Sequence, residues 1–360
     1  MKRKLLFFIP KLSAGGSEKV TLHLLNNFDR SKYDIYLGIL SSRGEFFSEL
    51  KPDIKIHNMD TTLSNSLFKM VSLINSIRPD IVMSNLCSMN LVVGFTRLFI
   101  LNKKPMYVAR ESGIPSQREL VFTKMRIYRI LYRLSYLLFD RVVCQSDDML
   151  EEVHELYRVP LSKLIKIYNP INVNLVRQLS KENSLSLQSD KINLLAVGRL
   201  DIVKGYDQLL KSFALTKNER LHLHILGNGA EGPALKRFAA DLRISERVTF
   251  HGFQKNPYSF MSAADLFVMT SKYEGLPNAM LEAMSLGCPA VAYQCKGGIK
   301  EIIHDGQNGY LIKYGAIDKF AEMLDRGIYL MLNRDQIAKQ VLDRFNLQKI
   351  ICDYEKVFSS

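Results

Sequence analysis

Residues 192–205 carry the sequence INLLAVGRLDIVKG, an apolar run that ends at a glycine and is followed by two basic residues. The run lacks the regular apolar–polar alternation of a half-exposed strand, so we predict a strand buried on both faces. Such strands form parallel sheets with helices on either side. The loop that follows the strand then lies at the carboxyl edge of the sheet, where ligands bind in such folds.

The same pattern recurs on both sides of this stretch. Short apolar runs alternate with segments of helical spacing, which predicts an α/β protein with two doubly wound parallel sheets. Two such domains facing each other would leave a cleft between them. The strands are expected at residues 5–9, 33–40, 81–83, 106–109 and 141–144 in the first half, and at 192–197, 221–226, 248–250, 266–269 and 290–292 in the second.

The boundary between the two halves is predicted after Asn169-Pro170, because the residue before a proline avoids the helical region. A serine-rich stretch follows and leads into the strand at residue 192. We therefore expect a first domain over residues 1–170, a linker over 171–190 and a second domain over 191–335.

The composition is that of a globular protein, with 47% apolar and 24% charged residues among 360. No apolar run reaches the roughly 18 residues that span a bilayer. The basic N-terminus with its apolar run 5–9 imitates a signal peptide, but the run is short and a buried first strand explains it better. The five cysteines have no paired spacing, which favours a reducing cytoplasm over a disulfide framework or a zinc site.

The net charge of +13 favours an anionic partner, and the excess is greatest between Arg97 and Arg133. From residue 124 onward this region has helical spacing, with an apolar stripe on one side and arginines on another. Two interpretations stand side by side: a core-facing helix with a solvated basic back, or a surface that docks on an anionic membrane leaflet. Nucleic acid is not expected, because no nucleic-acid-binding module is recognisable.

The loop after residue 197 holds the first candidate site residues, Arg199 and Lys204. Arginine supplies a forked donor and lysine a point charge, so the two could hold one diphosphate. The plainer alternative is two solvated surface charges. Their position after a buried strand and beside two glycines favours the phosphate.

The densest motif is Glu274 to Glu282, which lies in the sequence SKYEGLPNAMLEAM of residues 271–284. Pro277 fits the first position of a helix, which places Glu274 in the entry loop and Glu282 inside the helix. The amides of Asn278 and Ala279 would then point out of the helix start, where a phosphate is favoured. Apolar neighbours predict that Glu282 is largely covered and has a partner; the alternative is a loop acid and a solvated helix acid.

Two weaker signals remain. Gly15 and Gly16 follow the first strand and serve either a ligand or only a tight turn. His222 and His224 share one face of a strand, but a metal site usually needs a third or fourth ligand, so a helix-facing or solvent-facing surface is expected there.

Together these residues resemble the family 4 retaining glycosyltransferases (GT4) of the GT-B type, which have two Rossmann-like domains. The similarity covers almost the whole chain. The motifs that carry it are Gly15-Gly16, residues 140–146 and 168–170, Val197-Gly198-Arg199 with Lys204-Gly205, residues 226–229 and 250–253, the pair Glu274 and Glu282, Gly297-Gly298 with residues 301–303, and Asn308-Gly309.

The resemblance implies a role for each matching residue. Arg199 and Lys204 would hold the diphosphate of a nucleotide-sugar donor, Glu282 the ribose hydroxyls and Glu274 the donor sugar; these two cations and Glu274 are the expected catalytic groups. Gly16 would let the N-terminal domain close on the donor, and backbone groups near Phe253 would lie beside the base. The remaining donor-binding positions are Gly15, Gly227, Leu276, Pro277, Asn278 and Ala279.

The chain departs from the family at one place. Many relatives have a histidine near the donor sugar, whereas residues 109–112 here contain Arg110 and Glu111. A catalytic histidine therefore cannot be carried over. The resemblance also implies an acceptor-binding N-terminal domain, a nucleotide-sugar-binding C-terminal domain and a last helix, residues 336–360, that crosses back to the N-terminal domain.

The expected activity is retaining sugar transfer from a nucleotide sugar, UDP-sugar before GDP-sugar, to a lipid-linked or cell-surface saccharide in bacterial polysaccharide, lipopolysaccharide or capsule synthesis. No metal or other cofactor is expected, because the sequence contains no Asp-x-Asp. The expected location is the cytoplasm, with docking on the inner face of the membrane. The alternatives are a transferase or phosphorylase with a soluble acceptor, and a non-catalytic nucleotide-sugar-binding subunit.

Overall fold

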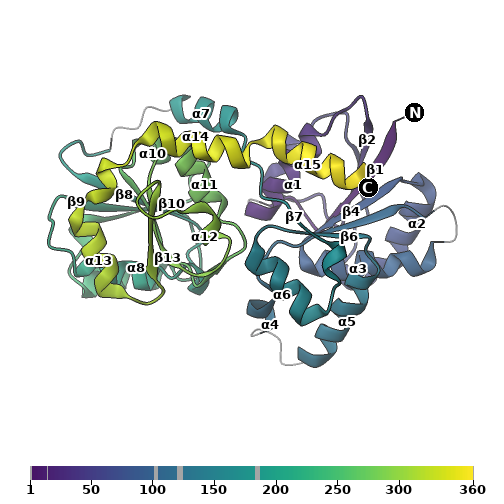
Figure 1. The fold of residues 1–360 in the computed structure, drawn as a ribbon, viewed down its shortest axis with the longest axis horizontal. Helices are drawn as coiled ribbons and strands as arrows, with labels where there is room; N and C mark the ends of the chain where they lie inside the picture. Colours follow the sequence, from purple (N-terminus) through teal and green to yellow (C-terminus); the bar gives the residue numbers. More distant parts are fainter. Residues whose placement is uncertain (1, 14, 101–103, 120–124, 183–186, 360) are drawn as a thin grey trace. The chain divides into compact units, whose positions relative to one another are not determined.

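The computed structural model describes residues 2–13, 15–100, 104–119, 125–182 and 187–359 (Figure 1). The chain forms two compact units, one of residues 1–170 with 347–360 and the other of residues 171–346. Each unit contains one parallel sheet with helices on both faces, which confirms the predicted α/β fold class. None of the described helices has both the length and the apolar character needed to cross a membrane.

The sheet of the first unit has seven strands in the order β3-β2-β1-β4-β5-β6-β7. Its interior is a cluster of large apolar side chains, because β1 and β4 are buried on both faces as the sequence predicts. The strands are β1 (Arg3–Ile9), β2 (Tyr33–Ile39), β3 (Lys55–Asn58), β4 (Ile81–Asn85), β5 (Met106–Arg110), β6 (Arg141–Cys144) and β7 (Leu164–Lys166).

The helices of this unit form two groups. On one side α3 packs against both α2 and α5, and α5 packs against α6; α1 packs against α15. Their bounds are α1 (Gly16–Asn27), α2 (Leu67–Ile77), α3 (Cys87–Thr96), α4 (Pro115–Glu119), α5 (Met125–Leu137), α6 (Asp147–Tyr157) and α15 (Leu347–Ser359), with a short 3-10 turn η3 (Arg97–Phe99) after α3.

The sheet of the second unit has the order β10-β9-β8-β11-β13-β15, which repeats the winding of the first six strands of the other sheet. Two short strands, β12 and β14, pair with each other beside it. The strands are β8 (Ile192–Val197), β9 (Leu221–Leu226), β10 (Val248–Gly252), β11 (Leu266–Met269), β12 (Tyr273–Glu274), β13 (Ala290–Gln294), β14 (Lys296–Gly297) and β15 (Gly309–Lys313).

Helices α8, α9 and α13 pack together, as do α7, α10, α11 and α14. The bounds are α7 (Val173–Glu182), α8 (Tyr206–Ala214), α9 (Gly232–Asp241), α10 (Tyr258–Ala263), α11 (Asn278–Ser285), α12 (Ile299–Ile302), α13 (Ile317–Arg326) and α14 (Arg334–Phe345); the 3-10 turns η5 (Ile202–Lys204) and η7 (Ile328–Met331) lie in loops.

The predicted linker 171–190 is wrong in its first part, because α7 occupies residues 173–182. Val173 and Val176 bury the apolar face of this helix against α10 and α11. Serine content is typical of a linker, but the two buried valines attach this segment to the second unit. Residues 183–186 lie outside the described part of the chain.

The last helix predicted over residues 336–360 is two helices. The chain leaves the helical conformation at Asn346, where ψ is 134°. Helix α14 packs on α11, whereas α15 belongs to the first unit, where Tyr354 and Phe358 contact the ring of Phe28. Only the part after residue 346 therefore returns to the first unit.

The apolar stripe of α5 does not face the core, so the interpretation as a core-facing helix with a solvated basic back is wrong. Ile127, Ile130, Leu134 and Leu137 are exposed, while Tyr136 is buried. Polar and aromatic side chains, among them Ser135 and Tyr136, occupy the inner face of this helix.

Candidate functional site

The winding of the second sheet places two loops side by side. Strands β8 and β11 are neighbours in the sheet. From β8 the chain continues to β9 on one side, and from β11 it continues to β13 on the other side. The carboxyl ends of β8 and β11 therefore form the switch point where α/β proteins bind ligands. The loop after β8 contains Arg199 and Lys204, and the loop after β11 leads to Glu274 and α11. These residues come together because of the strand order, although some 70 positions separate Lys204 from Glu274.

The loop after β8 is built to hold Lys204 in place. The carboxylate of Asp201 accepts hydrogen bonds from the backbone amides of Val203 and Lys204, at 3.1 and 3.2 Å. Gly205 then takes a φ of +64°, and a Cβ there would come within 2.3 Å of the Thr270 carbonyl oxygen. Only glycine permits this approach, so the two loops are in backbone contact at this point.

An ion pair joins the two loops. The Nζ of Lys204 lies 2.6 Å from Oε1 of Glu274, and both side chains are mostly buried. The amide of Lys272 donates to the carbonyl of Val203, and the pairing of β12 with β14 fixes Glu274 from its other side. The structure thus brings Lys204, predicted to bind the diphosphate, into contact with Glu274, predicted to bind the donor sugar.

Arg199 has a different environment. Its side chain is 79% exposed and lies 3.1 Å from the carboxylate of Asp201. A surface ion pair of this kind contributes little stability. The guanidinium is therefore accessible to an anion arriving at the loop, and Asp201 orients it.

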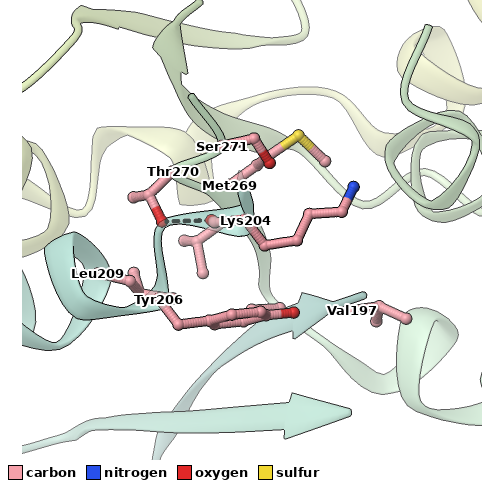
Figure 2. A pocket seen from close by; sticks show the side chains of 9 residues that line it. Val197, Lys204, Tyr206, Leu209, Met269, Thr270 and Ser271 are labelled. Carbon is pink, nitrogen blue, oxygen red and sulfur yellow. Dashed lines mark hydrogen bonds between the residues drawn. The ribbon is translucent and has the colours of Figure 1, made fainter. Parts of the chain in front are cut away.

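A small pocket opens beside Lys204 (Figure 2). The hydroxyl of Ser271 lies in its wall and, among the described residues, has no hydrogen-bond partner although it is buried. A buried hydroxyl without a partner costs free energy, so this oxygen is suited to a hydrogen bond with a ligand. Burial also raises the pKa of Tyr206, which therefore stays neutral in the wall of the pocket. The lining residues are Ala196, Val197, Lys204, Tyr206, Leu209, Val268, Met269, Thr270 and Ser271.

Helix α11 starts at Asn278, one position later than predicted, with Pro277 as the residue before the first turn. Leu276 and Glu282 are buried, the latter with 6% exposure, which confirms that this carboxylate is covered. The half-exposed Asn278 and Ala279 form the first turn. The predicted second acid therefore lies inside the unit, one helical turn beyond the start of α11.

Two other predicted positions have contrasting surroundings. Gly227 has a φ of +135°, and a Cβ there would come within 1.9 Å of the Gly198 carbonyl oxygen, so this glycine lets the loops after β8 and β9 approach each other. Phe253 follows β10 and is 58% exposed, which leaves its backbone and ring accessible. Both lie at the same carboxyl edge as Arg199.

Gly15 and Gly16 lie in the first unit, at the start of α1. Gly15 precedes the helix in an extended conformation, and the carboxylate of Glu18 covers the position that its Cβ would take. The glycines form the predicted strand-to-helix turn, and their part in donor binding stays a prediction.

Arg110 and Glu111, the residues predicted where many relatives have a histidine, are both buried at the end of β5. Nη1 of Arg110 donates to Oδ1 of Asn85 at 2.8 Å, and Nη2 donates to Asn169. Burial lowers the pKa of Arg110. Glu111 accepts hydrogen bonds from the amide of Ser112 and from the hydroxyl of Tyr136. The sequence analysis named Asn169 only as part of a turn motif and missed Asn85 and Tyr136, because only the fold brings these three residues to the end of β5.

His222 and His224 are buried on β9, as expected of a helix-facing surface, and His251 of β10 joins them. Nε2 of His224 lies 3.0 Å from Asn193 Oδ1, and Nδ1 lies 2.9 Å from His251 Nε2. Among the described residues, neither these three histidines nor any other group of three or more His, Cys, Asp or Glu side chains is arranged to hold a metal ion. This trio is a hydrogen-bonded part of the core.

Both units match models of known protein families. Residues 14–175 match the family model described as Glycosyltransferase Family 4, and residues 178–340 match the model described as Glycosyl transferases group 1. A Haemophilus influenzae glycosyltransferase is 26% identical, covering 99% of this chain and 98% of its own. The N-acetylgalactosamine-N,N'-diacetylbacillosaminyl-diphospho-undecaprenol 4-alpha-N-acetylgalactosaminyltransferase of Campylobacter jejuni is 27% identical, covering 94% and 92%.

Solved structures share the whole fold. Anabaena Alr3699/HepE in complex with UDP-glucose superimposes with a TM-score of 0.82 at 19% identity, covering 99% of both chains. The lipopolysaccharide outer core galactosyltransferase WaaB gives a TM-score of 0.77 at 21% identity, covering 99% of both.

Proposed function

Because the chain belongs to the family 4 glycosyltransferases with the GT-B fold, we propose that it transfers a sugar from a UDP-sugar to a hydroxyl of a lipid-linked or cell-surface saccharide, with retention of configuration. The observation that carries the proposal is the cluster of Arg199, Lys204 and Glu274 at the switch point of the second sheet. Two relatives support the acceptor class: the Erwinia amylovora glycosyltransferase named for amylovoran biosynthesis, and the Campylobacter jejuni transferase whose name contains diphospho-undecaprenol.

The charges at the site match the chemistry of the leaving group. In the reaction the bond between the anomeric carbon and the diphosphate oxygen breaks, and its electron pair stays on the diphosphate. The acceptor oxygen bonds to the anomeric carbon from the same face, and its proton passes to the departing diphosphate or to solvent. Lys204 and Arg199 stabilise the negative charge that develops on the leaving oxygen.

Glu274 serves two states of the site. Before the donor binds, it neutralises Lys204 at 2.6 Å. When a diphosphate takes its place beside Lys204, the carboxylate is available to accept hydrogen bonds from the hydroxyls of the donor sugar. Ser271 supplies a further donor at the pocket wall, and Glu282 accepts from the ribose.

A uracil nucleotide is preferred on the strength of the shared fold with Alr3699/HepE, which was solved with UDP and with UDP-glucose. The lipid-linked acceptor is proposed from the name of the Campylobacter jejuni relative, which contains diphospho-undecaprenol. The proposed reaction requires no bound metal, because the two cations supply the positive charge at the diphosphate.

The test is a panel of UDP, GDP and their sugars. UDP should raise the melting temperature of the protein and GDP should not, because a ligand bound only by the native state stabilises it. Slow hydrolysis of one UDP-sugar without acceptor should follow, and a chelator should leave its rate unchanged. Binding without hydrolysis or transfer would support the non-catalytic subunit instead, and strong inhibition by the chelator would contradict the metal-free mechanism.

A further inference from the structure

Helix α5 turns an apolar stripe toward solvent. Ile127, Ile130, Leu134 and Leu137 recur at intervals of three and four residues and so share one helix face. Their exposed fractions are 62, 57, 47 and 36%. Single exposed apolar residues are common, but a row of four large ones along one helix marks a contact surface.

The opposite face of α5 fixes this orientation. Ser135 donates to the carbonyl oxygens of Asn90 and Leu91 in α3, and the hydroxyl of Tyr136 bonds to Glu111. The ring of Tyr132 lies 5.5 Å from that of Tyr157 in α6. Rotating the helix to bury the stripe would break these contacts and leave Glu111 without its tyrosine partner, so the stripe stays outside.

Positive charge borders the stripe. At about 100° per residue, Arg133 lies next to Leu137 and Ile130 around the helix, and Arg129 lies beyond it. Both arginines are exposed. An apolar stripe with arginines along one side is the composition of a helix that lies in a membrane interface. A second copy of this chain, with a net charge of +13, would bring like charges together, whereas anionic lipids complement them.

The neighbouring elements add apolar groups on the same side of the sheet. Helix α3 packs against both α2 and α5 (Figure 1). Leu98 and Phe99 of η3, at the end of α3, are 62% and 42% exposed. The ring of Phe99 lies 5.6 Å from that of Phe68 on α2, which is also exposed.

We propose that α5 lies in the interface of an anionic bilayer, with its apolar stripe among the acyl chains and Arg129 and Arg133 at the lipid phosphates. This deepens the proposed function, since it names the surface that brings the enzyme to a lipid-linked acceptor. The docking itself requires no acceptor, so it can be tested with plain lipid. An apolar insertion, unlike charge attraction alone, resists salt.

The chain contains no tryptophan, which allows a single reporter. I130W should shift its emission to shorter wavelength and lose acrylamide quenching on vesicles that contain phosphatidylglycerol. M331W, on η7 of the second unit at a side chain that is 86% exposed, is the matched control and should not respond. Unchanged I130W emission would overturn the proposal. So would a blue-shifted emission already present in buffer with the mass of a dimer, because a second copy would then cover the stripe.

Vesicle sedimentation separates insertion from charge attraction. The double variant I130D/L134D should lose about tenfold or more of its partitioning, and L330D/M331D should lose none. The double variant R129Q/R133Q should bind vesicles more weakly than the wild type at low salt. The wild type should keep part of its vesicle binding in about 0.5 M NaCl. If the arginine variant alone lost binding while I130D/L134D kept it, docking would be purely electrostatic and insertion wrong. Vesicles without acceptor keep this outcome independent of sugar transfer.

Discussion

The loops after β1 and after β8 occupy the same place in two sheets of the same winding, yet their charged side chains differ. The loop after β1 contains one cation, the exposed Lys11, and the helix that follows the loop carries the acid Glu18 in its first turn. The loop after β8 carries two cations, one of them paired with an acid from the next loop. The fold provides a ligand edge twice, and the side chains decide which of the two edges favours an anion.

Replacing Lys204 tests the comparison most strongly. Lys204→Ala should lower kcat/KM by about 10²–10³-fold, because a preorganised charge at the leaving group is lost. The steady-state rate of UDP release measures this. Lys211→Ala is the matched control, because it removes the same kind of side chain from a solvent-accessible position on α8; its kcat/KM should stay close to that of the wild type. Glu18→Gln in the other loop should change the rate less than tenfold; a loss as large as that of Lys204→Ala would end the contrast between the loops.

The two glycine turns should also differ in stability. Gly205→Ala places a Cβ against the Thr270 carbonyl oxygen at a positive φ, so it should lower the free energy of unfolding of the second unit by about 2–3 kcal/mol. Gly15→Ala meets only the flexible end of Glu18 at a negative φ and should cost less than about 1 kcal/mol. Denaturant unfolding measures both. If both variants lost the same free energy of unfolding, the backbone contact between the loops after β8 and β11 would not be what makes Gly205 necessary.

Acid should affect the second unit through its buried imidazoles. Burial, helped by His222 and His251, lowers the pKa of His224 from 6.5 to about 4. His224 itself faces Asn193 on β8. Its neighbour His222 faces Thr249 on β10 and the charge of Lys191, and His251 faces Phe260 on α10. Between pH 6.5 and 4 the unfolded imidazole takes up a proton that the native state excludes, so stability falls as pH falls through this window.

The expected loss is about 2 kcal/mol, because solvent screens part of the effect. Urea unfolding at about pH 7 and about pH 4.5 measures it across the window. His224→Gln should flatten the dependence, and His304→Gln, an exposed position, should not. An unchanged slope in His224→Gln would assign the acid sensitivity to other groups.

The sequence predicted the strands that are buried on both faces and the edge strand β10, and it missed the edge strands β3, β7 and β15. Continuous apolar runs mark β1 and β8, whereas β3 is mostly exposed and short, so no pattern distinguishes it from a loop. The proximity of Lys204 and Glu274 and the burial of Glu282 followed from the predicted strands and helix, whereas the roles of these residues came from the family resemblance and stay predictions. Ser271 could not be predicted from the sequence. It is a candidate because its hydroxyl is buried without a hydrogen-bond partner among the described residues, and only the packing of the folded chain shows this.

Helix α5 shows a different limit. Periodicity correctly identifies an apolar stripe, but it does not say what covers the stripe. The tyrosines and Ser135 of the other face compete for the interior through hydrogen bonds to α3 and Glu111, and they occupy it. By hydrophobicity alone, isoleucine is expected to be buried in preference to serine. Here specific polar contacts bury Ser135 and leave the isoleucines of α5 exposed.

The return of α15 to the first unit has a consequence for how the chain is made. Leu347, Ile350, Ile351 and Tyr354 belong to the same apolar cluster as β1, so the core of the first unit is complete only after residues 347–354 have been made. The second unit, residues 171–346, needs none of them. A chain truncated before residue 347 and released from the ribosome should therefore protect residues 171–346 from protease, while residues 1–170 are still digested.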